Sequence, residues 1–389
     1  MKSHLAAPAY RAELRAWLAR NADSLAPHRG LPAPSIEDAI AHALGLHRRL
    51  FEEGFSRHGW PRELGGLGGG AELRGILYEE LYAAGYQLPE SFDLLETLGP
   101  LLERHAPALA RVHLPRFLAG DELWSQGFSE PGAGSDLASL RTRAEAVDGG
   151  FRVSGQKLWS GFAHLAAYAA VLVRTGTPES RHRGLSMLWV DLRAPGVRVR
   201  PILAASGRNE FCEIFFDGAR VPESHLIGAL HGGWAVAMDM LQFERGMYAW
   251  QRQARLHTRL EQALADCGEG ASGSRAALAG AVGDAYLAAF ALRQKCRDTV
   301  QRLAAGENPG PEISIDKVLL SSAEQSVYDA ARELLWPRLE LDAGDEASAW
   351  RSEWYFARAS SILGGAVEVQ RDIIAERLLG LPKGRAAGA

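Results

Sequence analysis

The chain contains little cysteine and no long apolar segment. Its three cysteines, Cys212, Cys267 and Cys296, are far apart among 389 residues and match neither a disulfide framework nor a zinc site. This usage is typical of a reducing compartment, so we expect a cytoplasmic protein. The longest apolar run, Leu165–Val173, is too short to cross a bilayer, which predicts no membrane span.

Strong net charge and metal-ligand spacings are absent as well. The formal net charge of −4 gives no electrostatic reason to expect nucleic-acid binding. The twelve histidines form no H-E-x-x-H or similar pattern, so we predict no metal site. Arg11, Glu13 and Arg15 stand where a signal peptide would need an apolar core, so we expect none.

The hydrophobic pattern changes period twice along the chain, which predicts three parts in an α+β protein. Residues 1–124 have helical periodicity, as in an N-terminal α-helical domain. Residues 125–230 contain short β-rich runs between turn signals, which favour a small barrel or sandwich. Residues 231–382 are helical again and predict a four-helix bundle, and 383–389 predict a disordered tail.

Long helices are expected on both sides of the β-rich part. The helical stretches on which this expectation depends are Leu94–Leu118, Trp234–Asp266, Ala276–Ala305, Ile313–Trp336, and Glu346–Gly380 with a break at its Gly-Gly.

The most unusual stretch is Ser125–Asp136, Ser-Gln-Gly-Phe-Ser-Glu-Pro-Gly-Ala-Gly-Ser-Asp. Pro131 interrupts regular structure, and Gly132 and Gly134 let the backbone turn and approach a ligand closely. Ser129 and the free loop N–H groups add donors within a small space, which suits a phosphate-bearing or polyfunctional ring ligand. An ordinary Gly/Pro turn is the alternative interpretation.

A carboxylate interrupts the apolar stripe of the predicted helix Trp234–Asp266. Ala237, Leu241, Glu244 and Tyr248 follow one another at helical spacing on one face. A carboxylate on such a face is desolvated, which raises its pKa toward the range of a general base. A buried glutamate paired with a neighbouring cation is the alternative.

Four motifs together resemble the acyl-CoA dehydrogenase family, and the resemblance covers nearly the whole chain. They are Phe128-Ser-Glu-Pro-Gly-Ala-Gly-Ser-Asp136, Gly155-Gln-Lys-Leu-Trp159, Glu210-Phe-Cys-Glu-Ile-Phe-Phe-Asp217 with Val221-Pro222, and Gly364-Gly-Ala-Val-Glu-Val-Gln-Arg371 with Ile374-Ala-Glu-Arg377. The Ala-Glu-Arg-Leu-Leu-Gly-Leu-Pro end is similar to that of the actinobacterial branch.

The resemblance implies FAD in a cleft between the β-domain and the bundle. It also implies an acyl thioester that loses a Cα proton to a base while hydride passes from Cβ to flavin N5. The family places this base either at the position of Gly364, which has no side chain here, or at that of Glu244. The resemblance therefore implies Glu244 as the base and a backbone N–H near Gly364 as a donor to the thioester carbonyl.

Further site residues follow from the same resemblance. Those expected to bind the cofactor are Phe128, Ser129, Gly134, Ser135, Trp159, Ser160, Gly365 and Glu368. Those expected to border the substrate are Ser135, Met240, Arg245, Met247 and Tyr248, although bulky side chains at helical spacing are also typical of a core.

Four features of the sequence depart from the family pattern around the cofactor. Gly161 stands where a Thr or Ser usually bonds flavin N5, and Ser160 is a possible replacement. Ala366 and Val367 replace two hydroxyl residues, and the Arg-x-x-Phe-Gly motif that grips the FAD pyrophosphate has no counterpart after Glu244. Trp336 and its neighbour Pro337 occupy a loop that is normally glycine-rich.

The expected partners are also implied by the resemblance. They are an acyl-CoA or a carrier-protein thioester as substrate, an electron-transfer flavoprotein as acceptor, and a homodimer or homotetramer. The departures keep two alternatives open: a degenerate or partner-dependent subunit that pairs with a paralogue, and a flavin monooxygenase on the same fold. Glu244 argues against the monooxygenase, because such members lack the base.

Overall fold

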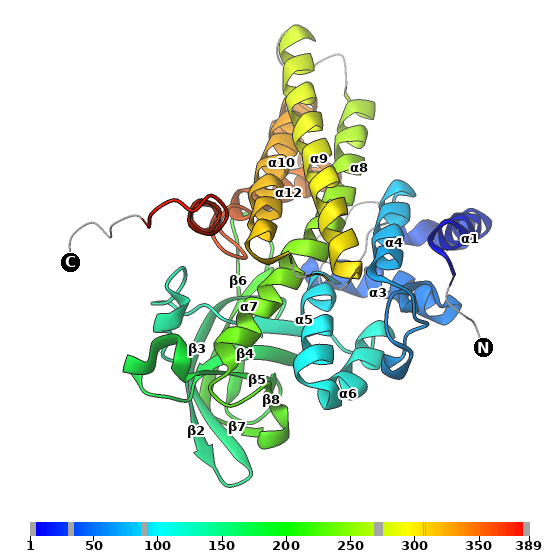
Figure 1. Cartoon of the computed structure of the whole chain (residues 1–389). Coiled ribbons are helices and arrows are strands. Elements are labelled where there is room, and N and C mark those ends of the chain that lie inside the picture. The colour runs from blue at the N-terminus through cyan, green and yellow to red at the C-terminus, as the bar shows by residue number, and fades with distance from the viewer. Residues whose placement is uncertain are drawn as a thin grey trace. The chain divides into compact units, whose positions relative to one another are not determined.

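The computed structural model describes residues 5–29, 35–86, 92–267, 275–305, 307 and 309–383, without the side chains of Glu244, Arg245 and 275–277. The chain forms two compact units, Met1–Phe243 and Glu244–Ala389, and each is described by itself (Figure 1). Across the described residues, no helix combines the length and the apolarity that a membrane crossing requires.

Helices form the first part of the first unit, as the periodicity predicts. They are α1 (Ala7–Arg20), α2 (Ala22–Leu25), α3 (Ile36–Glu53), α4 (Ala71–Ala83), α5 (Phe92–His105) and α6 (Pro107–Leu118). The helical stretch expected over Leu94–Leu118 consists of two helices, because the chain breaks at Ala106 (φ −148°, ψ 61°). Pro107 explains the break, since proline disfavours helical backbone in the residue before it.

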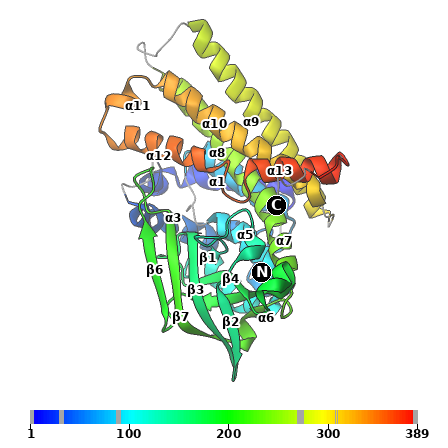
Figure 2. The same ribbon diagram turned by 90° about the vertical axis from the view of Figure 1, so that its left-hand side faces the viewer.

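The β-rich part folds into one eight-stranded sheet. Its strands are β1 (Trp124–Gly127), β2 (Arg143–Val147), β3 (Gly150–Gly161), β4 (Tyr168–Arg174), β5 (Leu185–Asp191), β6 (Val197–Ile202), β7 (Phe211–Pro222) and β8 (Leu226–Ile227). The order is β6-β7-β3-β2-β4-β5-β8, and β1 pairs with β4 in parallel. Figure 2 shows β6, β7, β3 and β2 side by side.

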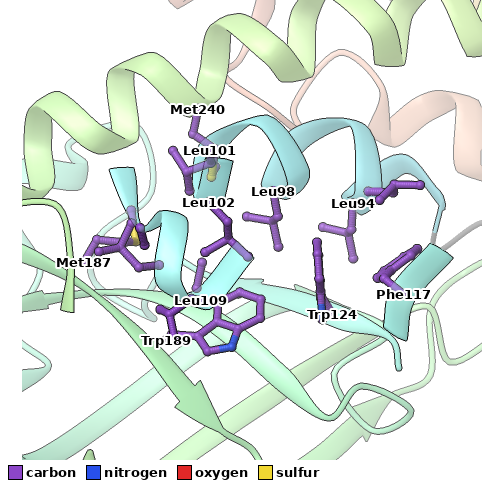
Figure 3. Packing of buried hydrophobic residues seen from close by; sticks show 14 of the residues in the cluster. Leu94, Leu98, Leu101, Leu102, Leu109, Phe117, Trp124, Met187, Trp189 and Met240 are labelled. Atoms are coloured by element: carbon purple, nitrogen blue, oxygen red, sulfur yellow. The ribbon is translucent and has the colours of Figure 1, made fainter. Parts of the chain in front are cut away.

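The two faces of this sheet pack into different hydrophobic clusters. One cluster joins β1, β4 and β5 to α5, α6 and α7 (Gly233–Phe243), with Trp124, Trp189 and Leu98 at its centre (Figure 3). The other lies among the strands themselves and includes Val171 and Ile214. Burying an aromatic or leucine side chain is worth about 1.5–3 kcal/mol, so the first cluster fixes α7 against the sheet.

Helices make up the second unit. They are α8 (Ala249–Ala265), α9 (Arg275–Ala304), α10 (Ile313–Leu334), α11 (Arg338–Leu341), α12 (Asp345–Ala359) and α13 (Val367–Ile373), with π-turns at Glu244–Tyr248 and Ile374–Leu378. The uninterrupted α-helix expected over Trp234–Asp266 is therefore wrong in its middle. Hydrophobic spacing does not reveal a π-turn, because such a turn inserts one residue into an otherwise regular pattern.

Buried ion pairs join the helices of the second unit. The Arg252 guanidinium lies 2.5 Å from the Glu324 carboxylate, which joins α8 to α10. Arg255 and Arg259 both lie 2.5 Å from the Glu353 carboxylate, which joins α8 to α12. The helices, the central sheet and the C-terminal helices confirm the predicted α+β class.

Candidate functional site

The loop that begins at Phe128 is a tight turn with an exposed centre. Glu130 and Ala133 exchange backbone hydrogen bonds of 2.9 and 3.1 Å, so the chain reverses through Pro131 and Gly132. A Cβ added at Gly132 or at Gly134 would meet nothing within 4 Å. The centre of the loop is therefore open for contact with a ligand.

Buried charged side chains hold both ends of this loop. Lys157, which is 0% exposed, donates to the Phe128 carbonyl at 3.0 Å and to the Glu130 carboxylate at 2.8 Å. Glu130 in turn accepts from the backbone N–H groups of Arg141 and Thr142 at 2.7 and 2.9 Å. Burial lowers the pKa of Lys157 to about 8, although Glu130 favours its charged form. Burial opposes ionisation of Glu130 too, but Lys157 holds the pKa of this carboxyl below its usual range.

Trp159 projects an indole into solvent beside the loop. Its side chain is 52% exposed, and its left-handed backbone (φ 63°) is uncommon outside glycine. The register between β3 and β7 shifts between Lys157 and Ser160, which is a β-bulge that re-aims a side chain. The preceding N–H, that of Leu158, donates to the Ser129 carbonyl at 2.9 Å, so the backbone next to Trp159 is tied to the loop.

Ser160 and Gly161 end the same strand. Ser160 is buried opposite Cys212, and its hydroxyl has no hydrogen-bond partner within the described part of the chain. The Gly161 carbonyl accepts from the Ser125 hydroxyl at 2.7 Å. A Cβ at Gly161 would meet nothing within 4 Å, so a larger residue fits there.

Cys212 also faces a histidine. His164 Nδ1 lies 3.1 Å from Cys212 Sγ, and its Nε2 lies 3.0 Å from Glu37 on α3. Burial raises the pKa of the Cys212 thiol. This arrangement links a helix to the sheet and leaves the thiol unreactive.

In the second unit, the predicted Gly-Gly lies in the loop between α12 and α13. Gly364 (φ 63°) and Gly365 (φ 96°) both have left-handed backbone, which costs other residues about 1–2 kcal/mol. The Ser360 carbonyl anchors this loop by accepting from Lys317 Nζ and from the Ser321 hydroxyl at 2.7 Å. Glu368 lies in the first turn of α13.

Glu244 begins the π-turn Glu244–Tyr248, although its side chain and that of Arg245 are outside the described residues. π-turns are rare and occur frequently at functional sites. Within this turn Met247 is buried and Tyr248 is half-buried. Met240 is fully buried in the cluster around α5, where Figure 3 shows it beside Leu101, and Ser135 is exposed.

The structure thus brings Phe128, Ser129 and Trp159 together in the first unit, as the motifs lead one to expect. Glu244, Gly364 and Glu368 belong to the second unit. Sequence reasoning missed three site-related groups: Lys157, Arg174, and Gln370, whose buried amide has no partner within the described residues. The place of Lys157 inside the Gly155–Trp159 motif was a signal for the first of them. No group of three His, Cys, Asp or Glu side chains that could hold a metal occurs in the described ranges.

Comparisons with known proteins agree with this fold. Sequence models of two families match: the acyl-CoA dehydrogenase middle domain over residues 125–219, and the acyl-CoA dehydrogenase C-terminal domain over residues 231–379. The chain is similar to acyl-CoA dehydrogenase IpdE1 of Mycobacterium tuberculosis, with 37% identity over 380 residues that cover 96% of this chain and 97% of the relative.

Solved structures show the same architecture. A variant of the Tcur3481–Tcur3483 steroid ACAD aligns with a TM-score of 0.83 at 26% identity, over 97% of this chain and 100% of that one. The ChsE4–ChsE5 complex from Mycobacterium tuberculosis aligns with a TM-score of 0.78 at 26% identity, over 99% and 100%. The chain therefore belongs to the acyl-CoA dehydrogenase family, whose members are flavin-dependent enzymes that use FAD.

The residues of the first unit fit a flavin. An exposed indole offers a large flat apolar surface, and the open centre of the loop lets its backbone N–H groups approach a ring edge. The second unit offers fewer polar groups than the family pattern. Val367 is buried and Trp336 is 42% exposed where hydroxyl and glycine residues are usual.

Proposed function

We propose that this chain is an FAD-dependent dehydrogenase that introduces an α,β double bond into an acyl thioester, carried by coenzyme A or by a carrier protein. The observation that carries the proposal is the exposed Trp159 indole, which follows directly on the backbone hydrogen bond that ties Leu158 to Ser129 of the open 128–136 loop. The indole of Trp159 is 52% exposed and offers a large flat apolar surface on which a flavin ring can pack.

Each proposed site residue has a chemical task. Phe128, Ser129, Gly134 and Ser135 bind the polar edge of the ring and the thioester arm, and Trp159 covers a ring face. Bound FAD supplies the acceptor for the hydride that leaves Cβ.

The second unit supplies the groups that act on the thioester. Glu244 takes the Cα proton, while a backbone N–H near Gly364 and Gly365 polarises the thioester carbonyl as charge develops on it. Arg245, Met247 and Tyr248 of the same unit, with Met240 of the first unit, complete the proposed substrate side. Ser160 and Glu368 are kept as further cofactor contacts.

A second candidate is a subunit that needs a paralogue to bind FAD. The observation that favours it is the apolar pair Ala366 and Val367, because the loss of two hydroxyls removes about 0.5–1.5 kcal/mol of binding for each one. Two of the structural neighbours are named as two-component assemblies. For the active form we propose a homodimer or homotetramer in the cytoplasm, with an electron-transfer flavoprotein as electron acceptor.

The experiment that separates these candidates is the flavin content of the purified chain. The dehydrogenase proposal expects yellow protein with about one FAD per chain, and bleaching of the flavin when acyl-CoA is added without oxygen. Colourless protein that free FAD cannot reconstitute would contradict it for the chain alone. Recovery of the flavin after co-purification with a paralogue would then support the second candidate.

A serine at position 161 is expected to strengthen FAD binding. Because a Cβ there meets nothing within 4 Å, Gly161→Ser should change the free energy of unfolding by less than about 0.5 kcal/mol. A new hydrogen bond of about 0.5–1.5 kcal/mol would lower the Kd for FAD roughly two- to tenfold. Fluorescence titration with FAD measures this change.

The matched control is Gly155→Ser on the same strand. A Cβ there would lie 2.6 Å from the Thr142 hydroxyl, and the backbone φ is +144°, so this variant should be destabilised and should gain no affinity. An unchanged Kd in a stable Gly161→Ser protein would show that position 161 does not face the cofactor.

A further inference from the structure

Three buried charged side chains converge on one loop. Lys157 from β3 bonds the Phe128 carbonyl and the Glu130 carboxylate at the start of the loop. Glu130 reaches across it to the backbone N–H groups of Arg141 and Thr142. Arg174 from β4, which is 4% exposed, donates to the carbonyls of Ala138 at 2.7 Å and Leu140 at 2.9 Å near the end of the loop.

The same arginine also holds a second loop. Arg174 donates to the carbonyls of Thr177 and Arg181 at 3.2 and 3.0 Å, in the connection between β4 and β5. Its donors are thus divided between two loops that are separate in sequence. The exposed ion pair between Arg181 and Asp136, at 3.1 Å, joins the same two loops at the surface.

Burying charges is expensive, and an apolar core would often be as stable as a buried ion pair. The neighbouring strands already form an apolar core, which includes Val171 and Ile214. The charges here satisfy loop carbonyls and N–H groups that apolar side chains could not bond. Their effect is therefore to fix the backbone of the loop.

We propose that Lys157, Glu130 and Arg174 are positioning residues that hold both ends of the 128–142 loop, so that its exposed centre keeps a ligand-binding shape, and that Arg174 couples this loop to residues 177–181. The proposal rests on the proposed function for the identity of the ligand, FAD with its thioester substrate. The three residues act through the loop backbone and do not themselves touch the reacting atoms.

The charge state of Lys157 gives this arrangement a pH dependence. The charged groups that face Lys157 are Glu130, which favours its protonated form, and Arg174, which opposes it. Because its pKa is lowered to about 8, Lys157 is protonated below that pH and neutral above it. The charged pair with Glu130 is thus present below about pH 8, and an opening of the loop that exposes the amine becomes less favourable as the pH rises from about 8 toward its ordinary pKa of 10.5.

The test compares the double variant Lys157→Met/Glu130→Gln with wild type by amide hydrogen exchange. Removing both charges avoids leaving one of them buried alone. The amides of Arg141, Thr142 and Leu158 should exchange at least tenfold faster, while those of β4 and β5 keep their protection. Arg174→Met should instead loosen Ser139 and Leu140, whose N–H groups close the turn at Leu137–Ser139.

The matched control is Arg152→Gln, which removes an exposed ion pair from the same sheet, between Arg152 and Glu145. A folded double variant with wild-type exchange at Arg141 and Thr142 would overturn the proposal. Equal acceleration throughout the sheet would overturn it as well, because it would mean general destabilisation.

Two further measurements test the same arrangement. In wild type, the protection factors of the loop amides should rise several-fold between pH 8 and 9.5, because an opening that exposes Lys157 restores its ordinary pKa of 10.5 and must take up a proton; a fall over this range would overturn the burial of the amine by the closed loop. The Kd for FAD should rise at least tenfold in the double variant, and an unchanged Kd in the folded variant would overturn the role of the loop in binding. If wild type binds no FAD at all, the proposed function fails, while the exchange data still decide the proposal on the loop.

Discussion

Glu244→Gln is expected to lower the rate of substrate-dependent flavin reduction by about 10³-fold, with FAD content unchanged. A positioned general base typically contributes 10²–10⁴-fold, and glutamine has nearly the same shape without the ability to accept the proton. Stopped-flow bleaching of the flavin by the acyl-CoA that reduces wild type measures the rate. Exchange of the Cα hydrogen with deuterated water measures the same step without hydride transfer, and should also be lost.

The matched control is Glu261→Gln, which changes an exposed carboxylate on α8 and should leave both rates at the wild-type level. Bleaching and Cα exchange at wild-type rates in Glu244→Gln would exclude Glu244 as the base. Moving a carboxylate to Gly364 is a harder version of this test, because its left-handed backbone adds about 1–2 kcal/mol of strain to any glutamate placed there.

Glu353→Ala is expected to destabilise the second unit by about 3–5 kcal/mol, the usual cost of removing one partner from a buried ion pair. Arg255 and Arg259 both lose their bonds to this carboxylate, and the Arg259 side chain is only 4% exposed. Burial alone would raise the pKa of Glu353, but the two guanidiniums hold it well below its usual range. The contribution to stability is therefore present at neutral pH and is lost only as the pH falls through the lowered pKa.

Thermal or urea unfolding, followed by circular dichroism, measures this loss. Glu346→Ala is the matched control, because Glu346 lies on the same helix in an exposed pair with Arg338 at 3.0 Å, worth about 0–1 kcal/mol. Equal losses in the two variants would show that the buried cluster does not stabilise the unit.

The hydrophobic periodicity of the sequence predicted which parts of the chain are helical and which part forms strands, and it predicted most of the long helices. It could not predict the short strands β1, β2 and β8, which pair over four, five and two residues respectively, because their pairing depends on distant strands. It missed the break at Ala106 although Pro107 was visible, since leucine spacing continues through both helices. The three-domain division at residues 124 and 230 stays a prediction.

The candidate site was predictable where a motif keeps its residues consecutive. The loop and Trp159 were found this way, and their hydrogen-bonded contact through Leu158 explains why the two motifs occur together. Arg174 was not predictable, because an arginine at the end of an apolar strand usually marks a solvated edge. Its importance comes from four carbonyls that only the folded chain brings together. The assignment of individual site residues, Glu244 included, stays a prediction.

The π-turn at Glu244–Tyr248 makes the spacing of this segment sensitive to length. A π-turn contains one residue more than an α-helical turn, and each residue rotates a helix by about 100°. The inserted residue therefore sets the rotational phase of all that follows in α8, including the side of the helix on which Arg252, Arg255 and Arg259 meet their carboxylates. Substitutions within the turn preserve that phase, whereas loss of one residue would turn these three arginines away from Glu324 and Glu353 together. The length of this segment is thus constrained by the ion pairs of the second unit, independently of any role of Glu244 in catalysis.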